Sequence, residues 1–391
     1  MKTKLLFING HLNYGGVEKS LVDILSNINY NEYSVDLLLL EGKGDYSSFL
    51  PKEVNVILYD LHSTYGSMLS VMRQCLKKLD FFSIWIKIVF LLSNRFDMKI
   101  MRLLKPYILP DKYYDVVIGF RPGVSTDFAA WLFKTKKRIT WWHNGEIRLT
   151  PDQIMNYRSD CNEINSVVVV SNGCRDMLVN ELDIPKEKIK VIPNMIDSFK
   201  IINLSQEYIP NYLSDNKLNI ISVGRLSKEK HFDDCIVSAK LLKENGIDFK
   251  WIIVGDGIER KKLEKLINEY HLQEYVILLG KKNNPYPYMC YADIYVHPSY
   301  VESQCLTILE SMALGIPCVV ADSLGPREYC QNNINCIYVN HEKNALFEGI
   351  KQMLKLKNTK ELEIMKINAK KTALTFNIKE IMQLFYNLLN N

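Results

Sequence analysis

The stretch from Glu302 to Glu310 reads Glu-Ser-Gln-Cys-Leu-Thr-Ile-Leu-Glu and decides the fold of this 391-residue chain. It follows an apolar run, Asp293 to His297, and continues as an apolar helix from about Leu306 to Leu314. A strand, a loop and a helix therefore follow one another, with one carboxylate in the loop and one in the helix. The start of such a helix offers backbone amides to an anion. The pattern is typical of an α/β sheet that binds a phosphate beside two carboxylates.

A second strand-turn-helix unit, earlier in the chain, supplies two cations. Arg225 follows the apolar run Leu218 to Val223 through a single glycine, Gly224, and Lys230 comes after the turn. Parallel α/β sheets bind their ligands in the crevice outside the carboxyl ends of the strands. Positive charge at this place suits a diphosphate, and the two carboxylates suit the hydroxyls of a ribose.

Short β-rich runs alternate with helix-patterned stretches along the whole chain, which predicts βαβ units and parallel sheets. The alternation is interrupted by a polar, Pro-bearing interval from Asn203 to Asn216. At about 100–200 residues per domain, a chain of this length is expected to form two domains. We therefore expect an α/β fold with two doubly wound parallel-sheet domains, a linker near residues 195–216 and a closing C-terminal helix at 376–391.

Composition excludes several classes of protein. The formal net charge is only +5, and no run of Lys and Arg interleaved with aromatics recurs, so nucleic acid is not an expected partner. Nine cysteines without a Cys-x-x-Cys pair argue against a disulfide frame or a zinc knuckle. The first apolar stretch, Leu5 to Ile8, is too short for the core of a signal peptide. These features favour a cytoplasmic protein.

One insert, residues 62–112, departs from the alternation. Its apolar stretch, residues 81–92, is interrupted by Lys87 and is shorter than the ~20 residues that span a bilayer. Basic residues flank it between positions 73 and 105, and Trp and Phe accompany them, which suits docking on an anionic membrane surface. A helix packed on the sheet of the first domain, with solvated lysines, explains the same pattern. Both interpretations stay open.

The loop after the first strand carries Gly15 and Gly16 and leads into a helix that reaches about Ile28. A Gly-Gly turn lets the backbone approach a ligand without a Cβ in the way. Strand-to-helix loops also carry glycine for turn geometry alone. If the two domains face each other, the amides at Gly16 would hold one diphosphate from the side opposite Arg225 and Lys230.

Together these motifs resemble the retaining glycosyltransferases of family 4 (GT4), which have the GT-B fold of two facing Rossmann-like domains. The resemblance covers nearly the full chain. The motifs that carry it are Gly15-Gly16-x-Glu18, Val170-Ser171, Val191 to Asp197, Gly224 to Lys230, Gly255-Asp256-Gly257, the Glu-x7-Glu element from Glu302 to Glu310, and Ser311 to Pro317. The resemblance implies an acceptor-side domain at 1–197 and a nucleotide-sugar-binding domain at 198–375, with a cleft between them.

The resemblance also implies a role for each matching residue. Arg225 and Lys230 would bind the donor diphosphate and stabilise the negative charge that grows on it, the kind of stabilisation that dominates catalysis. Glu310 would accept hydrogen bonds from the ribose hydroxyls, and Glu302 would lie beside the transferred sugar. His143 would approach the donor sugar and phosphate from the first domain, although a lone histidine after an apolar strand is also a common structural residue.

Backbone groups and small residues complete the expected donor site. The amides of Leu306 and Thr307 would meet the distal phosphate at the helix start. The other residues expected to bind the nucleotide sugar are Gly15, Gly16, Gly224, Gln304 and Cys305. The resemblance implies reaction on a single face of the sugar, with no protein nucleophile, and with the leaving phosphate taking the acceptor proton. No Asp-x-Asp motif occurs, so we expect no metal and no other cofactor.

Three departures from the family pattern bear on this site. His231 stands where the family most often has glycine after the lysine, and Met195 stands where glycine is usual in the Asn-Gly-x-Asp element. Gln304-Cys305 replaces the common Phe-Gly. Because this pair is expected beside the donor, it bears on which sugar fits. Cys305 is interpreted as a small buried filler or as a reactive thiol.

The leading hypothesis is a retaining enzyme that moves a hexose or N-acetylhexosamine from a nucleotide diphosphate sugar, with UDP-sugars favoured, to an acceptor hydroxyl. The expected acceptor is a glycan or lipid-linked intermediate of bacterial cell-surface polysaccharide or glycolipid synthesis, with the protein peripheral on the inner face of the cell membrane. Two alternatives remain: a non-catalytic nucleotide-sugar-binding or scaffold partner, and a nucleotide-sugar epimerase of the same fold. A dehydrogenase is disfavoured because no Gly-x-Gly-x-x-Gly follows the first strand.

Overall fold

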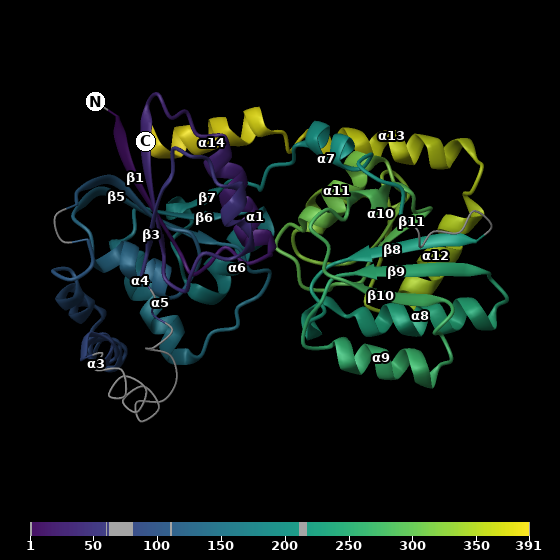
Figure 1. Ribbon diagram of the computed structural model, residues 1–391, viewed down its shortest axis with the longest axis horizontal. Coiled ribbons are helices and arrows are strands. Elements are labelled where there is room, and N and C mark those ends of the chain that lie inside the picture. The colour runs from purple at the N-terminus through teal and green to yellow at the C-terminus, as the bar shows by residue number, and fades with distance from the viewer. Residues whose placement is uncertain (1, 60, 62–80, 110–111, 211–216, 391) are drawn as a thin grey trace. The chain divides into compact units, whose positions relative to one another are not determined.

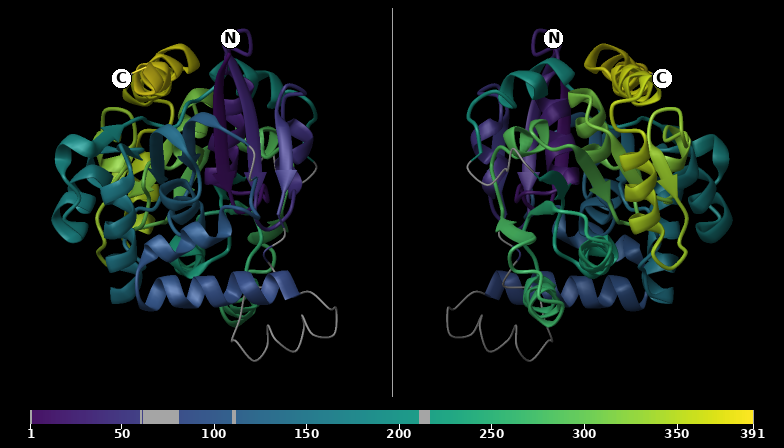
Figure 2. Two further views of the ribbon diagram at one scale, coloured as in Figure 1. Left: turned by 90° about the vertical axis from the view of Figure 1, so that its left-hand side faces the viewer. Right: turned by 90° about the vertical axis from the view of Figure 1, so that its right-hand side faces the viewer.

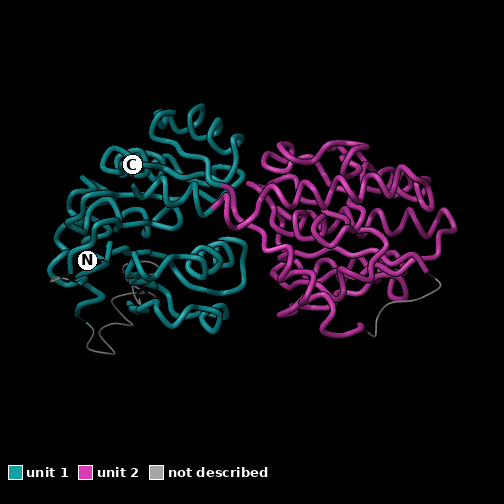
Figure 3. Tube along the Cα trace, turned by 90° about the horizontal axis from the view of Figure 1, so that it is seen from above, with its two compact units in different colours: residues 1–192, 382–391 teal, residues 193–381 magenta. Residues whose placement is uncertain are grey.

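The computed structural model describes residues 2–59, 61, 81–109, 112–210 and 217–390. The chain divides into two compact units (Figure 3). Unit 1 contains residues 1–192 and 382–391, and unit 2 contains residues 193–381. Residues 195–216, where the linker was expected, therefore belong to unit 2, and the last turns of the chain return to unit 1.

Unit 1 is built on a seven-stranded sheet with the order β3-β2-β1-β4-β5-β6-β7, and every pair is parallel. The first strand lies in the middle, with Leu5 opposite Val35 on one side and Val116 on the other. Residues Leu5 to Ile8 of this strand are fully buried. A parallel sheet that is covered on both faces requires such continuous apolar runs. The strands are β1 (Thr3–Asn9), β2 (Tyr33–Leu39), β3 (Asn55–Leu58), β4 (Tyr114–Gly119), β5 (Thr135–Trp142), β6 (Ser166–Val169) and β7 (Ile189–Val191).

Helices connect these strands as crossovers (Figure 1). The α-helices described in unit 1 are α1 (Gly16–Ser26), α3 (Phe81–Arg95), α4 (Val124–Trp131), α5 (Pro151–Glu163) and α6 (Asn172–Leu182). The short 3₁₀ helices are η1 (Asp45–Phe49), η3 (Met98–Leu104) and η4 (Lys186–Lys188). Helix α5 begins with a capping box in which Thr150 and Gln153 satisfy each other's backbone amides. The local sequence signal therefore agrees with the observed start of this helix.

Unit 2 repeats the same topology with six parallel strands in the order β10-β9-β8-β11-β12-β13. Side chains alternate between its two faces. Ile220 packs with α8 (Phe232–Glu244), and the next residue, Ile221, packs on the other side with α11 (Leu306–Leu314). Figure 1 shows these two helices on opposite faces of the sheet. The remaining elements of this unit are β8 (Leu218–Val223), β9 (Phe249–Val254), β10 (Val276–Gly280), β11 (Ile294–His297), β12 (Cys318–Ala321), β13 (Ile337–Val339), α7 (Ser198–Leu204), η5 (Lys228–Lys230), α9 (Arg260–Glu269), α10 (Tyr286–Cys290), η6 (Pro326–Glu328), α12 (Ala345–Lys355) and α13 (Lys360–Leu374).

The expected fold class is confirmed. Both units are α/β, and in both the first strand lies at the centre of a sheet that grows outward in two directions, which is the doubly wound arrangement. Such a sheet has a topological switch point beside its first strand. In unit 2 the switch point lies between β8 and β11, the two strands that precede the cation and carboxylate motifs.

Helix α14 (Ile378–Asn390) ends the described chain and packs in unit 1. The ring of Phe385 lies 6.3 Å from that of Phe7 and 6.2 Å from that of Trp141, between centroids. The hydroxyl of Tyr386 accepts a 2.9 Å hydrogen bond from the backbone amide of Asn29. The C-terminal helix therefore contributes aromatic side chains to the core of the first sheet.

The described part of the basic insert folds as α3 and η3. Helix α3 lies at the periphery of unit 1 (Figure 2). It buries Ile86 and Val89, but the side chains of Phe81 and Trp85 are 64% and 37% exposed. Residues 62–80 and 110–111 of the insert, including the basic residues expected at 73, 77 and 78, lie outside the described residues. Helix α3 thus packs along one stripe and exposes apolar side chains along another.

Candidate active site

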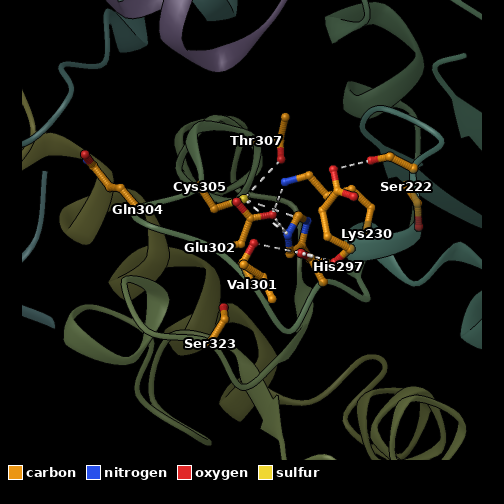
Figure 4. Close-up of polar contacts among 12 residues, drawn as sticks. Ser222, Lys230, His297, Val301, Glu302, Gln304, Cys305, Thr307 and Ser323 are labelled. Carbon is orange, nitrogen blue, oxygen red and sulfur yellow. Dashed lines mark hydrogen bonds and ion pairs between the residues drawn. The ribbon is translucent and has the colours of Figure 1, made fainter. Parts of the chain in front are cut away.

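The switch point of unit 2 brings Lys230 and Glu302 together. Lys230 ends η5, which follows β8 through the Gly224 turn, and Glu302 lies in the loop after β11. The ammonium of Lys230 contacts Oε1 of Glu302, and the side chains converge in Figure 4. The sequence predicted both residues for the donor site, and the structure places them in contact.

His297 is the third member of this cluster and was not predicted. It is the last residue of β11, and its Nε2 lies 2.9 Å from the same Oε1 of Glu302 (Figure 4). Its position at the carboxyl end of a strand beside the switch point was the signal that could have identified it. The apolar run that it ends made it resemble a structural core residue.

The electrostatics of this cluster favour its charged forms. Burial alone would raise the pKa of the Glu302 carboxyl, but the positive charge of Lys230 and the hydrogen bond from His297 lower it to about 2. Burial also opposes a charge on Lys230, yet Glu302 raises the pKa of its ammonium above the ordinary value. A carboxylate that is stabilised by two donors is a weak base and a weak nucleophile, so its charge can orient a sugar without attacking it.

A hydrogen-bonded relay supports the cluster from the strand side. Nδ1 of His297 lies 3.1 Å from the hydroxyl of Tyr295, which donates to Oγ1 of Thr307 at 2.8 Å. The thiol of Cys305 lies 3.3 Å from Nε2 of His297 and 3.4 Å from Oγ1 of Thr307. Cys305 is therefore buried within the site and contacts its ionisable groups.

The amino end of α11 points its first backbone amides out of the helix. Cys305 precedes the helix, and no side chain caps it. The amides of Leu306 and Thr307 are among those that lack a partner within the helix, and together with the helix dipole they favour an anion. Glu310 lies three residues after Thr307 and four after Leu306, and is therefore on the same side of the helix as these two residues. The predicted phosphate and ribose contacts thus share one helix face.

Glu310 is held in place by a neighbouring helix. Its carboxylate is buried, and Oε1 accepts a 3.0 Å hydrogen bond from the hydroxyl of Tyr286 in α10. A buried carboxylate held by a hydroxyl keeps acceptor capacity for a diol. This arrangement suits the ribose-binding role implied for Glu310.

Close backbone packing fixes the loops that carry these residues. A Cβ at Gly255, whose φ is +146°, would lie 1.8 Å from the carbonyl oxygen of Gly224. A Cβ at Gly325 would lie 1.9 Å from the carbonyl oxygen of Ser303, in the loop of Glu302. Only glycine fits at these two contacts, so the Gly-Asp-Gly motif supports the turn that carries Arg225 and Lys230.

Arg225 is placed differently from Lys230. Its side chain is exposed, and its guanidinium makes no ion pair with any residue that the structure describes. His231, the departure after Lys230, takes the left-handed conformation with φ +51° and precedes α8. This is the conformation that glycine adopts most readily, which explains why glycine is usual there. Its ring lies 4.7 Å from that of Tyr300, between centroids.

Gln304 lies away from the cluster. Its amide side chain accepts a 2.6 Å hydrogen bond from the backbone N–H of Asn194 and donates a 3.0 Å bond to the carbonyl of the same residue. Figure 4 shows it directed away from Lys230 and His297. Gln304 therefore ties the segment beside Met195 to the loop before α11, and its predicted contact with the donor stays a prediction.

In unit 1, Gly15 and Gly16 form the start of α1, where Gly15 is the N-cap and no side chain caps the helix. A Cβ added at Gly16 would meet no atom within 4 Å. Packing inside unit 1 therefore does not require glycine at this position. Close approach of a ligand is the remaining reason for it that the sequence suggested.

The contacts of a buried carboxylate near this helix start were also not predicted from the sequence. Glu18 is buried, with Oε1 3.6 Å from Nδ1 of His11 and 3.7 Å from a guanidinium nitrogen of Arg121. These residues come from the carboxyl ends of β1 and β4 and the first turn of α1. Their separation along the chain gave no local motif beyond Glu18 itself.

His143 follows β5 and is 8% exposed. Its ring stacks on that of Trp141 at an interplanar angle of 5°, and its buried Nε2 has no hydrogen-bond partner among the described residues. Burial, together with the positive charge of Arg121, lowers the pKa of His143 to about 3. A neutral imidazole with an unsatisfied nitrogen is ready to contact a ligand, as the role implied for it requires.

Comparison with known families identifies the family of this chain. The model described as glycosyl transferases group 1 matches residues 206–372, and the model described as glycosyltransferase family 4 matches residues 14–198. The two models together cover both units. The chain belongs to the group 1, family 4 glycosyltransferases.

Curated relatives match parts of the chain. An uncharacterized glycosyltransferase of Methanocaldococcus jannaschii is 27% identical over 249 residues, which are 61% of this chain and 61% of the relative. An N-acetylgalactosamine-N,N'-diacetylbacillosaminyl-diphospho-undecaprenol 4-alpha-N-acetylgalactosaminyltransferase of Campylobacter jejuni is 32% identical over 186 residues, 47% of this chain and 49% of that protein. The matched stretches thus span about half to three fifths of these relatives.

Solved structures share the fold along the full chain. A glycosyltransferase of Rickettsia africae superposes with a TM-score of 0.73 at 18% identity, covering 99% of this chain and 98% of that chain. HepE of Anabaena, in complex with UDP and glucose, superposes with a TM-score of 0.72 at 19% identity, covering 99% of both chains. The expected GT-B fold is therefore confirmed.

Proposed function

We propose that this chain is a retaining glycosyltransferase that moves a hexose or N-acetylhexosamine from a UDP-sugar to an acceptor hydroxyl. The observation that carries the proposal is the convergence of Lys230, His297 and Glu302 at the switch point of unit 2. The amino end of α11 and the buried Glu310 lie next to this cluster in the same sequence element. A diphosphate, a ribose and a sugar each have a matching group there.

The chemistry assigned to these residues follows from their charges. Lys230 and Arg225 stabilise the negative charge on the leaving diphosphate, and the amides of Leu306 and Thr307 add to that stabilisation. Glu302, held by Lys230 and His297, stabilises the positively charged sugar without forming a bond to it. The acceptor proton passes to the leaving phosphate, which gives retention without a protein nucleophile and without a metal.

The first test is a thermal-shift and hydrolysis screen with UDP- and GDP-sugars, with and without EDTA. One UDP-sugar should raise the Tm and release UDP slowly, insensitive to EDTA. The Lys230→Ala variant should lose both responses. The control variant Lys228→Ala, at an exposed neighbouring lysine, should keep them. A response to no nucleotide sugar would favour the scaffold alternative, and conversion of the sugar without an acceptor would favour the epimerase.

For the acceptor we propose a lipid-linked glycan of bacterial cell-surface polysaccharide or glycolipid synthesis, handled by unit 1 as the acceptor-side domain. The Campylobacter relative is named for a diphospho-undecaprenol acceptor. Helix α3 exposes Phe81 and Trp85, with Lys87 and Arg95 on the same helix. An apolar side with basic neighbours suits a peripheral location on the cytoplasmic face of an anionic membrane. No helix in the described ranges has the length and apolarity that a membrane crossing needs.

Vesicle binding tests this location. The protein should sediment with phosphatidylglycerol vesicles and much less with phosphatidylcholine vesicles. Replacing Phe81 and Trp85 together by serine should reduce binding at least fivefold. The matched control is Ile258→Ser, a residue of unit 2 that is 88% exposed. Equal binding of all variants, or of both lipids, would contradict the proposal.

A further inference from the structure

Three buried side chains with different ligand atoms surround one point in unit 2. Nε2 of His297 lies 2.9 Å from Oε1 of Glu302 and 3.3 Å from Sγ of Cys305. All three atoms lie within 4.8 Å of one another. We propose that His297, Glu302 and Cys305 form a binding site for a soft divalent transition metal, with Zn²⁺ as the preferred ion.

The geometry is close to what zinc requires. Zn²⁺ binds nitrogen and carboxylate oxygen at about 2.0–2.1 Å and thiolate sulfur at about 2.3 Å, in a tetrahedral arrangement. These lengths place neighbouring ligand atoms roughly 3.3–3.5 Å apart. The Nε2 to Sγ distance of 3.3 Å and the Nε2 to Oε1 distance of 2.9 Å each fall a few tenths of an ångström short of the separation for their own pair of atoms. Small side-chain movements therefore complete the site.

The hydrogen-bonded relay orients the histidine for ligation. The hydroxyl of Tyr295 donates to Oγ1 of Thr307, so its oxygen is available to accept from Nδ1–H of His297. With the Nδ1 proton held in this way, loss of the Nε2 proton that is donated to Glu302 in the metal-free site leaves the Nε2 lone pair directed toward Glu302 and Cys305. Such an outer hydrogen bond to the second ring nitrogen is what metal-binding histidines use to fix tautomer and orientation.

The combination of ligands selects the ion. A thiolate and an imidazole favour Zn²⁺ or Co²⁺, whereas Mg²⁺ and Ca²⁺ prefer sites made of oxygen alone. On binding, the thiol of Cys305 and the Nε2–H of His297 would each give a proton to solvent, and the fourth position would be open to water. The ligand set is therefore unlike the oxygen-only sites that Mg²⁺ prefers.

Binding of the ion changes the partner of Lys230. The ammonium of Lys230 contacts the same Oε1 of Glu302 that Zn²⁺ would take. The ion therefore replaces the ammonium on this carboxylate and moves Lys230 from the position assigned to the diphosphate. Zn²⁺ and the donor should compete, so the metal should inhibit transfer reversibly. This inhibition rests on the function proposed above, whereas metal binding itself does not.

Co²⁺ titration of the purified full chain tests the site. We expect one bound Co²⁺ with the intense visible absorption of a tetrahedral complex, a thiolate-to-cobalt band in the near ultraviolet, and displacement of both by Zn²⁺. Cys305→Ser and His297→Ala should each weaken binding at least tenfold and remove the thiolate band or the tetrahedral spectrum. Cys290→Ser, at an exposed cysteine, is the control and should change neither. Circular dichroism and thermal melts show that each variant is folded.

The outcomes separate the two proposals. Absence of the thiolate band in the native chain, or its persistence in Cys305→Ser, would overturn the metal site, whatever the chain does with UDP-sugars. A Co²⁺ site in a chain that binds no nucleotide would leave the metal site intact and refute the transferase. UDP-sugar binding that Zn²⁺ does not weaken, at concentrations that saturate the Co²⁺ site, would contradict the competition with Lys230.

Discussion

Lys230 and the buried Glu302 form an ion pair although they are 72 positions apart in the sequence and follow different strands. The pair joins the turn after β8 to the loop after β11, on the two sides of the switch point. Removing one partner of a buried pair leaves an uncompensated charge and is usually strongly destabilising. Its two members therefore have to be tested with stability and activity measured together.

Lys230→Ala should lower kcat by about 10²–10³, the usual loss when one charge-stabilising donor is removed. The folded state should survive at 25 °C but melt at a lower temperature because Glu302 stays buried. Steady-state kinetics and thermal melts measure both. Lys228→Ala is the matched control from the same short helix. Equal loss in both variants would show that charge near η5, rather than this contact, matters.

Tyr286→Phe should raise KM for the donor with little change in kcat. The variant removes the hydroxyl that donates to Glu310, and one hydrogen bond of this kind is worth about 1 kcal/mol, roughly fivefold in affinity. Isothermal titration with UDP checks the expected loss. The control is Tyr291→Phe, at a largely exposed neighbour. An unchanged affinity for UDP would argue against ribose binding by Glu310.

Gly16→Ala should separate folding from ligand approach. A Cβ there meets no atom of the chain, and alanine in a helix is about 1 kcal/mol more favourable than glycine, so the Tm should hold or rise. Activity should nonetheless fall at least tenfold if the backbone at Gly16 touches the diphosphate. Full activity in a stable variant would show that neither the fold nor the ligand requires glycine at this position.

The buried carboxyl of Asp160 predicts a loss of stability at high pH. Burial, together with Asp127, raises its pKa to about 10, and its Oδ1 accepts a 2.6 Å hydrogen bond from Trp131. Because the folded state retains a proton that the unfolded state releases above about pH 4, stability falls as pH rises from about 4 toward 10. The slope should approach 1.4 kcal/mol per pH unit, by order of magnitude.

Asp160→Asn keeps the acceptor for Trp131 and removes this titration. Urea unfolding at pH 7 and pH 9 should show a smaller difference for the variant than for the native chain. Asp152→Asn, exposed on the same helix, should behave like the native chain. A native chain equally stable at both pH values would show that Asp160 ionises without cost.

His143 predicts the opposite dependence at low pH. Its pKa of about 3 lies below the ordinary value because burial and Arg121 disfavour the cation. The unfolded state therefore binds the proton first, and stability is lost as pH falls from about 6.5 toward 3. His143→Gln should flatten this part of the stability profile. If the native chain and the variant lose stability in parallel below pH 6, His143 does not account for the loss.

The sequence predicted the strand-turn-helix placement of several site residues because these residues lie in local motifs. Lys230, Glu302, Glu310 and the start of α11 were placed by apolar runs and strand-to-helix turns, which depend on neighbouring residues. The fold class was predictable for the same reason, because each buried strand of a parallel sheet appears in the sequence as one continuous apolar run.

What the sequence did not predict depends on contacts between distant segments. His297 looked like the end of a core strand, and only the pairing of β11 with β8 brings it to Glu302. The side chain of Gln304 pairs with the backbone of Asn194, 110 positions away, a contact that no local pattern signals. The contact with the donor that the motif implied for Gln304 stays a prediction.

Cys305 occupies a backbone conformation, φ +66°, that suits glycine. A side chain held there costs the folded state on the order of 1 kcal/mol. Cys305→Gly should therefore raise the melting temperature while it deletes the sulfur from the donor site. If this one substitution makes the chain more stable and less responsive to metals or oxidants, then the Cys305 thiol provides that response at a cost in folded stability.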